Sequence, residues 1–271
     1  MNKPFFLSRL QQLGSGLYNG LLFSNRLEVT YNRLFRRNAP VSIYIWDQRL
    51  FFIADCSHGD HIGLGEIFPQ REYDHLLRQC GLAGTAIRYV NIGANIGAFD
   101  VKLVDRGVGI EFGLSVELNP RTYERCLVNL QCNGLQKTRV INVGVAAADG
   151  SIQFSPNRCS LSDNIFDGKP STSEDTIRVE LVSLESLMAK YAGGVAELDL
   201  LKMDCEGAEY EIIRATPSIV LRRFRNVLVE FHGEPGGESL NAAYAKLSTA
   251  GFSALRTVPG KVRYLELFKR D

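Results

Sequence analysis

The stretch from residue 87 to residue 104 constrains the fold of this chain more than any other. It begins with an apolar run, residues 87–92, that is typical of a buried strand. Gly93 and Asn95 interrupt the run, and a helical pattern follows over residues 96–104. A strand, a turn and a helix in this order place free backbone N–H groups at a helix N-terminus, and glycine lets a ligand approach the backbone there. We therefore predict a nucleotide-type binding turn.

A carboxylate follows this turn at the distance expected of a nucleoside site. Gly93 and Gly97 have Gly-x-x-x-Gly spacing, which differs from the Gly-x-Gly-x-x-Gly of dinucleotide enzymes. A second strand then ends at Glu117, a position from which a carboxylate accepts hydrogen bonds from a ribose diol. Each feature alone is as compatible with an ordinary turn glycine or a solvated strand end. Together, in this order, they favour a nucleoside ligand.

Four short segments carry a more specific pattern. They are Val90–Gly97, Val116–Pro120, Leu201–Glu209 and Glu230–His232. Together they resemble the FkbM family of S-adenosylmethionine-dependent methyltransferases, and the Lys-x-Asp-x-Glu-Gly-x-Glu pattern that begins at Lys202 is the most specific piece. The resemblance implies S-adenosylmethionine as the cofactor. The family usually has Asp where this chain has Asn91, which keeps a carbonyl acceptor but lacks a charge that would help hold the ligand's ammonium or sulfonium group.

The order of the expected elements predicts an α/β fold. Strands are expected near residues 87–92, 114–117, 139–147, 198–203 and 226–231, with helices between them and a hairpin over residues 252–268. Parallel strands need right-handed helical crossovers, which this order supplies. We expect a class I methyltransferase (Rossmann-like) fold in residues 85–271: a seven-stranded, mostly parallel sheet with a C-terminal antiparallel hairpin. Residues 1–84 are expected to form an N-terminal helical and β extension.

Composition excludes several classes of protein. The chain has 271 residues, is 45% hydrophobic and has a net charge of +1, so it can bury a core and presents no overall field for nucleic acid. The cysteines form no Cys-x-x-Cys pair and the histidines are scattered, so no zinc site is expected. Neither a signal peptide nor an apolar stretch of about 18 residues is present. We therefore expect a cytoplasmic protein with reduced thiols and no transmembrane segment.

The N-terminal region offers two interpretations. Residues 1–38 are basic and partly amphipathic, with leucines at helical intervals interrupted by glycines. We favour a helical cap on the domain or on a partner subunit, which leaves a homodimer open; the alternative is weak peripheral contact with a membrane surface. Two strands are predicted over residues 41–54, and a helix is predicted over residues 67–80. The polar stretch between them contains Asp60 and His61, which the resemblance places beside the cofactor.

An excursion interrupts the alternation of strands and helices. Residues 151–154 and 176–182 are expected to form its two arms, and residues 155–175 between them are rich in Ser, Asn, Asp and Pro. Loops of this length inside a compact domain are usually functional or mobile. We interpret this loop as an acceptor-binding lid; a disordered insertion is the alternative.

The candidate site residues lie where predicted strands end, because ligands bind beyond the carboxyl ends of parallel strands. The cofactor-binding candidates are Asn91, Gly93, Asn95, Gly97, Glu117, Asn119, Asn142, Gly144, Asp204 and Glu206. The catalytic candidates are His232, Asp204 and Lys202. His232 is the expected base, Asp204 lies next to the expected methyl position, and Lys202 orients Asp204 or an acidic acceptor, or is a buried ion-pair partner. For Glu209 we prefer a structural role at a helix N-terminus.

Magnesium is possible but not favoured. Asp204, Glu206, Glu230 and His232 offer oxygen and nitrogen ligands, but nothing in their spacing demands a metal, and none is predicted. By the resemblance, the leading function is an O-methyltransferase that acts on a hydroxyl of a sugar in a glycan, glycolipid or related secondary metabolite. A dinucleotide-dependent oxidoreductase and a non-catalytic cofactor-binding protein are the alternatives.

Overall fold

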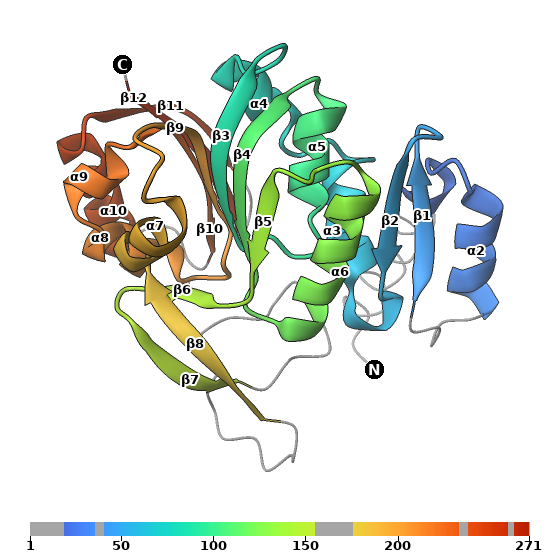
Figure 1. The fold of residues 1–271 in the computed structure, drawn as a ribbon. Helices are drawn as coiled ribbons and strands as arrows, with labels where there is room; N and C mark the ends of the chain where they lie inside the picture. Colours follow the sequence, from blue (N-terminus) through green and yellow to red (C-terminus); the bar gives the residue numbers. More distant parts are fainter. Residues whose placement is uncertain (1–18, 36–40, 155–175, 233–237, 260–262, 271) are drawn as a thin grey trace, which may run out of the picture.

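A seven-stranded mixed sheet forms the centre of the molecule (Figure 1). The computed structural model describes residues 19–35, 41–154, 176–232, 238–259 and 263–270. The strands are β3 (Ala86–Ile92), β4 (Gly109–Val116), β5 (Thr138–Ile141), β9 (Leu198–Met203), β10 (Phe224–His232), β11 (Phe252–Pro259) and β12 (Arg263–Arg270), in the order β11-β12-β10-β9-β3-β4-β5. The first five in chain order run parallel, and β12 is antiparallel to both β10 and β11. This arrangement confirms the predicted class I methyltransferase fold and its terminal hairpin.

Helices cover both faces of this sheet (Figure 1). They are α4 (Asp74–Cys80), α5 (Ala98–Asp105) and α6 (Pro120–Cys132) on one side, and α7 (Leu184–Ala192), α8 (Glu209–Ala215), α9 (Ser218–Leu221) and α10 (Glu238–Thr249) on the other. Successive strand residues face opposite ways, so Tyr89 packs with Phe99 while Val90 joins the cluster that contains Ile212 and Leu247. Burial on both faces explains the continuous apolar runs that mark these strands in the sequence.

The third predicted strand is two strands in different sheets. β5 ends at Ile141, and β6 (Gly144–Ala146) pairs with β8 (Ile177–Ser183), which pairs antiparallel with β7 (Gly150–Phe154). The side-chain amide of Asn142 donates to the carbonyl oxygens of Glu117 and Leu118, and this holds the chain away from the central sheet. The two arms of the excursion are confirmed; residues 155–175, the proposed lid, lie outside the described residues.

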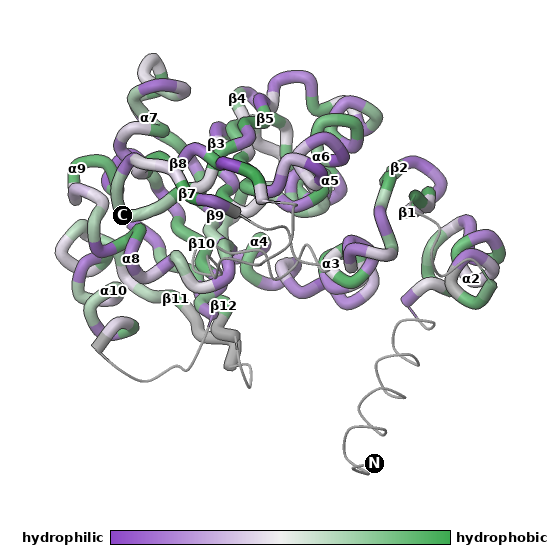
Figure 2. The backbone as a smooth tube through the Cα atoms, turned by 90° about the horizontal axis from the view of Figure 1, so that it is seen from below, coloured by the Kyte–Doolittle hydropathy of each residue, from purple (hydrophilic) through white to green (hydrophobic). Residues whose placement is uncertain are grey.

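The N-terminal region packs against α6. The hairpin of β1 (Ser42–Trp46) and β2 (Leu50–Ala54) forms as predicted. Side chains of Asn129 in α6 and of Asn133, which caps it, hydrogen-bond the backbone of β2. Phe52 shares a hydrophobic cluster with Leu130. The division of the chain at residue 84 remains a prediction. α2 (Arg26–Phe35) lies at the far edge and exposes Leu27 and Tyr31 (Figure 2). No helix among the described residues is long and apolar enough to cross a membrane.

The predicted helix over residues 67–80 is wrong in its extent. The structure has a 3-10 turn, η1 (Cys56–His58), then α3 (Asp60–Ile67) and a separate α4, with Arg71 between them in a left-handed conformation. α3 forms within a stretch that the sequence suggests is a polar loop. The carboxylate of Asp60 accepts a hydrogen bond from the backbone N–H of Asp55 and forms a buried ion pair with Arg125 of α6. Arg125 is 65 residues away in sequence, so local patterns do not reveal this pair.

Candidate functional site

A cavity of about 310 Å³ lies at the carboxyl ends of β3, β4, β9 and β10. Its polar and glycine lining includes the predicted residues Gly93, Asn95, Glu117, Gly144, Lys202, Asp204, Glu206 and His232. The structure therefore brings eight of the expected residues to one site. The N-terminal region contributes Leu64, Glu66 and Tyr73, whereas Asp60 and His61 do not line it.

Gly93 is required by the protein's own packing. It has a φ of 76°, and a Cβ atom there would overlap the carbonyl oxygen of Asp204. Gly97 has a φ of 80° and packs against Leu130 and Cys126 of α6, away from the cavity. Both positions need glycine for the left-handed backbone and for close packing. The close approach of β3, α6 and the end of β9 therefore accounts for both glycines. Gly93 also lines the cavity, and the approach of a ligand to its backbone stays a prediction.

Glu117 is held by the glycine turn itself. One carboxylate oxygen accepts the backbone N–H of Asn95 at 2.8 Å, and the other accepts the N–H of Asn119 at 2.9 Å. The side chain of Asn119 caps α6 by accepting the N–H of Arg121. Asn119 and Asn142 thus do not line the cavity. Their hydrogen bonds hold the backbone next to it.

Asn91 also lies behind the cavity. Its side chain is fully buried and donates to a carboxylate oxygen of Asp100 at 2.8 Å. Asp100 accepts further hydrogen bonds from Tyr89 and Ser115. Burial raises the pKa of Asp100, while these hydrogen bonds oppose the rise. The position where the family usually has Asp is therefore part of a buried network beneath the turn.

Lys202 connects the turn to the end of β9. Its ammonium group donates to the carbonyl oxygen of Gly93 at 2.9 Å and lies 3.0 Å from a carboxylate oxygen of Asp204. The side chain is almost completely buried. These contacts match the two roles that the sequence suggests for Lys202, which are to orient Asp204 and to form a buried ion pair.

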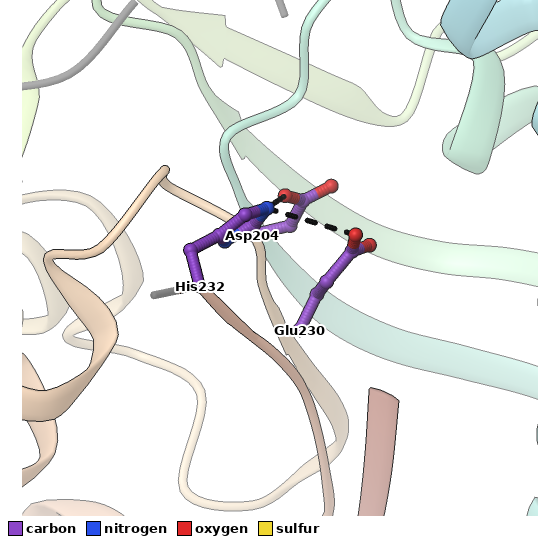
Figure 3. Close-up of side chains that lie close together, drawn as sticks. All are labelled: Asp204, Glu230 and His232. Carbon is purple, nitrogen blue, oxygen red and sulfur yellow. Dashed lines mark ion pairs between the residues drawn. The ribbon is translucent and has the colours of Figure 1, made fainter. Parts of the chain in front are cut away.

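Asp204, Glu230 and His232 converge at one end of the cavity (Figure 3). Nε2 of His232 lies 3.7 Å from Asp204, 3.6 Å from Glu230 and 3.7 Å from Glu206. Nδ1 lies 3.1 Å from Glu209. Burial on its own lowers the pKa of His232, but the hydrogen bond to Glu209 and the charges of Asp204 and Glu206 outweigh it and raise the pKa to about 9. The imidazole therefore carries a proton at neutral pH.

The two glutamates that follow Asp204 have different roles. Glu206 lines the cavity from a left-handed backbone conformation, with a φ of 56°. Burial, with a smaller contribution from Asp204, raises its pKa to about 7, against the opposing charge of His232. Glu209 is fully buried and accepts the backbone N–H groups of Cys205 and Gly207 at 2.7 and 2.9 Å. These bonds close the loop between β9 and α8, which is the structural role expected of Glu209.

Tyr73 is a site residue that sequence reasoning missed. It falls within the helix predicted over residues 67–80, and no site role is predicted for it. Its hydroxyl lies 2.8 Å from a carboxylate oxygen of Glu230, to which it donates, and 3.3 Å from one of Asp204. Burial and the neighbouring carboxylates raise the pKa of its phenol, so it stays protonated and donates. The sequence marks Glu230 as part of the segment Glu230–His232 and as a possible magnesium ligand, but not as a partner of Tyr73. No local signal links these residues.

Comparison with known proteins identifies the family. The chain matches the family model of the methyltransferase FkbM domain over residues 91–254. Methyltransferase sdnD of Sordaria araneosa is 27% identical over 175 residues, which cover 55% of this chain and 67% of that protein.

Two solved structures are similar in fold. The first is TYW2 of M. jannaschii in complex with AdoMet, with 11% identity, 86% of this chain and 87% of that chain covered, and a TM-score of 0.46. The second is the precorrin-6y C5,15-methyltransferase of Geobacter metallireducens, with 13% identity, coverage of 74% and 88%, and a TM-score of 0.44. Because the family model spans more than half of the sequence, this chain belongs to the FkbM family of methyltransferases.

Proposed function

We propose that this protein is an S-adenosylmethionine-dependent O-methyltransferase. Its acceptor is a hydroxyl group of a sugar in a glycan, a glycolipid or a related secondary metabolite. The observation that carries the proposal is one cavity along the carboxyl ends of neighbouring strands, lined by Glu117 after β4 at one end of the row β4-β3-β9-β10 and by Asp204, Glu230 and His232 at the other. Family membership supports methyl transfer.

The residues at the first end suit a nucleoside. Glu117 is oriented by two backbone N–H groups, and a carboxylate at this position can accept hydrogen bonds from a ribose diol. Leu118, Val143 and Val145 line the cavity beside it and offer an apolar surface to a flat base. The donor set therefore fits the cofactor. Gly93 and Asn95 would lie along its central part, and Asp204 and Glu206 near its charged end.

The residues at the second end suit a hydroxyl acceptor. Bound S-adenosylmethionine supplies a methyl group that is already activated, so the chain has to orient the acceptor and receive its proton. We assign both tasks to Asp204 and His232. Asp204 is held by Lys202 and Tyr73 and keeps an oxygen directed toward His232. His232 can receive a proton only after it has released the one that it carries at neutral pH.

Two measurements test the proposal. Isothermal titration calorimetry with S-adenosylmethionine and with NAD separates a methyltransferase from an oxidoreductase, and only the first ligand is expected to bind. Mass spectrometry of glycans and lipids from cells with and without the protein is then expected to reveal a product heavier by one methylene. Tight binding of NAD without binding of S-adenosylmethionine would refute the proposal. Binding of S-adenosylmethionine without methyl transfer to any acceptor would favour a non-catalytic protein.

A further inference from the structure

Asp204, Glu230 and His232 have the spacing of ligands that share one metal ion (Figure 3). One donor atom of each lies within 4.8 Å of the other two. Nε2 of His232 is 3.7 Å from Asp204 and 3.6 Å from Glu230. These separations exceed hydrogen-bond length, which is about 3.2 Å at most. They suit two atoms that are each bound to a common ion at about 2.0–2.2 Å.

The remaining atoms of these three side chains are already held by other residues. Tyr73 donates to the second oxygen of Glu230, and Lys202 pairs with the second oxygen of Asp204. Nδ1 of His232 contacts the carboxylate of Glu209. Histidines that bind metals almost always have their other ring nitrogen hydrogen-bonded to a carboxylate, a carbonyl or water, which orients the ring. Each of the three residues therefore directs one donor atom toward a shared point.

An independent observation also indicates a ligand there. Nε2 of His232 is shielded from solvent and has no hydrogen-bond partner among the described residues. A buried polar nitrogen without a partner is costly, and such atoms are rare in folded proteins. Three carboxylate oxygens surround this nitrogen at distances too long for hydrogen bonds. A metal cation that replaces the proton on Nε2 would satisfy the nitrogen and the carboxylates together.

We propose that Asp204, Glu230 and His232 bind one divalent transition-metal ion. One imidazole nitrogen and two carboxylates suit Mn²⁺ better than Mg²⁺, because Mg²⁺ prefers oxygen ligands and retains its water molecules. The sequence leaves magnesium possible but not favoured, since spacing alone does not reveal that three residues from two strands share a point. The ion would displace the proton from Nε2 of His232, because only a neutral imidazole binds a metal. The metal inference therefore replaces the role of base that the proposed function gives His232: His232 then acts as a metal ligand.

The site also suggests a class of acceptor; this step rests on the proposed function. Three protein ligands leave coordination positions open on a six-coordinate ion. Two adjacent oxygen atoms, such as the vicinal diol of a sugar, can occupy two of them and be oriented together. We therefore expect acceptors with vicinal hydroxyls to be preferred over those with a single hydroxyl.

Metal binding can be measured without cofactor or acceptor. Full-length protein that has been treated with a chelator is titrated with Mn²⁺ alone, and bound Mn²⁺ is followed by electron paramagnetic resonance. One ion per chain is expected. Glu230→Gln and Asp204→Asn should each weaken Mn²⁺ binding by about tenfold or more. Glu211→Gln is the matched control, because the Glu211 side chain is 46% exposed on α8, forms an ion pair with Arg214 and does not line the cavity; it should bind Mn²⁺ like the natural protein.

The outcomes separate the metal site from the proposed function. Equal Mn²⁺ affinity in all four proteins, or no binding by the natural protein, would overturn the metal inference. Circular dichroism and calorimetry with S-adenosylmethionine check that Glu230→Gln remains folded and retains its cofactor site. Persistent methyl transfer in the presence of a chelator would also refute the metal site while leaving the proposed function intact. Mn²⁺ binding without S-adenosylmethionine binding would support the metal site and refute the proposed function.

Discussion

The hydroxyl of Tyr73 lies 2.8 Å from the carboxylate of Glu230, although 157 residues separate the two in sequence. Tyr73 precedes α4, and Glu230 lies near the end of β10. Through this hydrogen bond and the contact at 3.3 Å to Asp204, the N-terminal region orients two carboxylates of the candidate site. The site is therefore built from both regions of the chain.

Tyr73→Phe tests this connection. The change removes a buried donor and leaves Glu230 without one of its hydrogen bonds, so the free energy of unfolding should fall by about 2 kcal/mol. Turnover should fall as well, while affinity for S-adenosylmethionine changes little, because Glu117 is untouched. Urea denaturation, kinetics and calorimetry measure these quantities. Tyr31→Phe, at an exposed position of α2, is the control. Equal stability of the Tyr73→Phe variant and the natural protein would contradict the role of this hydrogen bond.

Glu117→Gln should weaken cofactor binding. Either orientation of the amide sets its NH₂ group against the backbone N–H of Asn95 or of Asn119, and the negative charge is lost. We expect affinity for S-adenosylmethionine to fall about tenfold or more, equivalent to about 1.4 kcal/mol. Calorimetry measures the change. Glu111→Gln is the control on the same strand, since Glu111 is exposed and pairs with Arg88. An unchanged dissociation constant in Glu117→Gln would place the cofactor elsewhere.

Gly93→Ala should be strongly destabilising, because the added methyl group has no room and because the left-handed backbone conformation disfavours alanine. The new Cβ overlaps the carbonyl oxygen of Asp204, and the backbone is left-handed, so the unfolding free energy should fall by about 3 kcal/mol or more. Gly134→Ala separates the two causes. Gly134 has a φ of 79° but nothing lies within 4 Å of its Cβ position, and the expected cost is about 1 kcal/mol. Chemical denaturation compares the two variants, and similar losses would exclude the packing explanation.

His232→Asn should affect turnover more than cofactor binding. In the central sheet β9 and β3 separate β10, which ends at His232, from β4, which Glu117 follows. If His232 acts on the acceptor as proposed, its loss should slow methyl transfer about 100-fold or more. Calorimetry with S-adenosylmethionine should give an affinity close to that of the natural protein. His75→Asn provides the control, because His75 of α4 does not line the cavity. Unchanged turnover in His232→Asn would remove His232 from the site chemistry.

Glu266 should make the protein less stable as the pH rises. This residue of β12 is buried, one of its carboxylate oxygens has no hydrogen-bond partner among the described residues, and burial raises its pKa to about 7. Because the folded state holds the proton more tightly than the unfolded chain, stability is greatest below the ordinary pKa of 4.5 and declines as the pH rises through about 7.

Replacing Glu266 with Gln removes that titration. Glu266→Gln should therefore be more stable than the natural protein at pH 8, by about 2 kcal/mol, and the two should converge near pH 4. Urea denaturation across this pH range measures the difference. Glu185→Gln, at an exposed position of α7, should leave the pH dependence unchanged. A constant difference between Glu266→Gln and the natural protein at all pH values would show that Glu266 does not titrate in this way.

The sequence by itself determined which segments form the strands of the central sheet. It also determined most of the residues that line the cavity at the carboxyl ends of those strands. Apolar runs such as Leu198–Met203 predict buried strands, and the residues at their ends, among them Glu117 and Asp204, must meet at one edge because parallel strands end together. The cap of α6 at Asn119 and the β1–β2 hairpin are likewise set by neighbouring residues. These features depend on local periodicity and turn chemistry, which a single sequence displays.

Only the tertiary structure decided how the side chains at that edge are held. Asn91 faces a buried network instead of the cavity, Gly93 makes room for the backbone of Asp204, and Tyr73 reaches Glu230 across the sheet. Asp60, the first residue of α3, forms an ion pair with the distant Arg125. Such contacts join residues that are distant in sequence. They arise from how whole elements pack, and periodicity within one element carries no information about its partners in space.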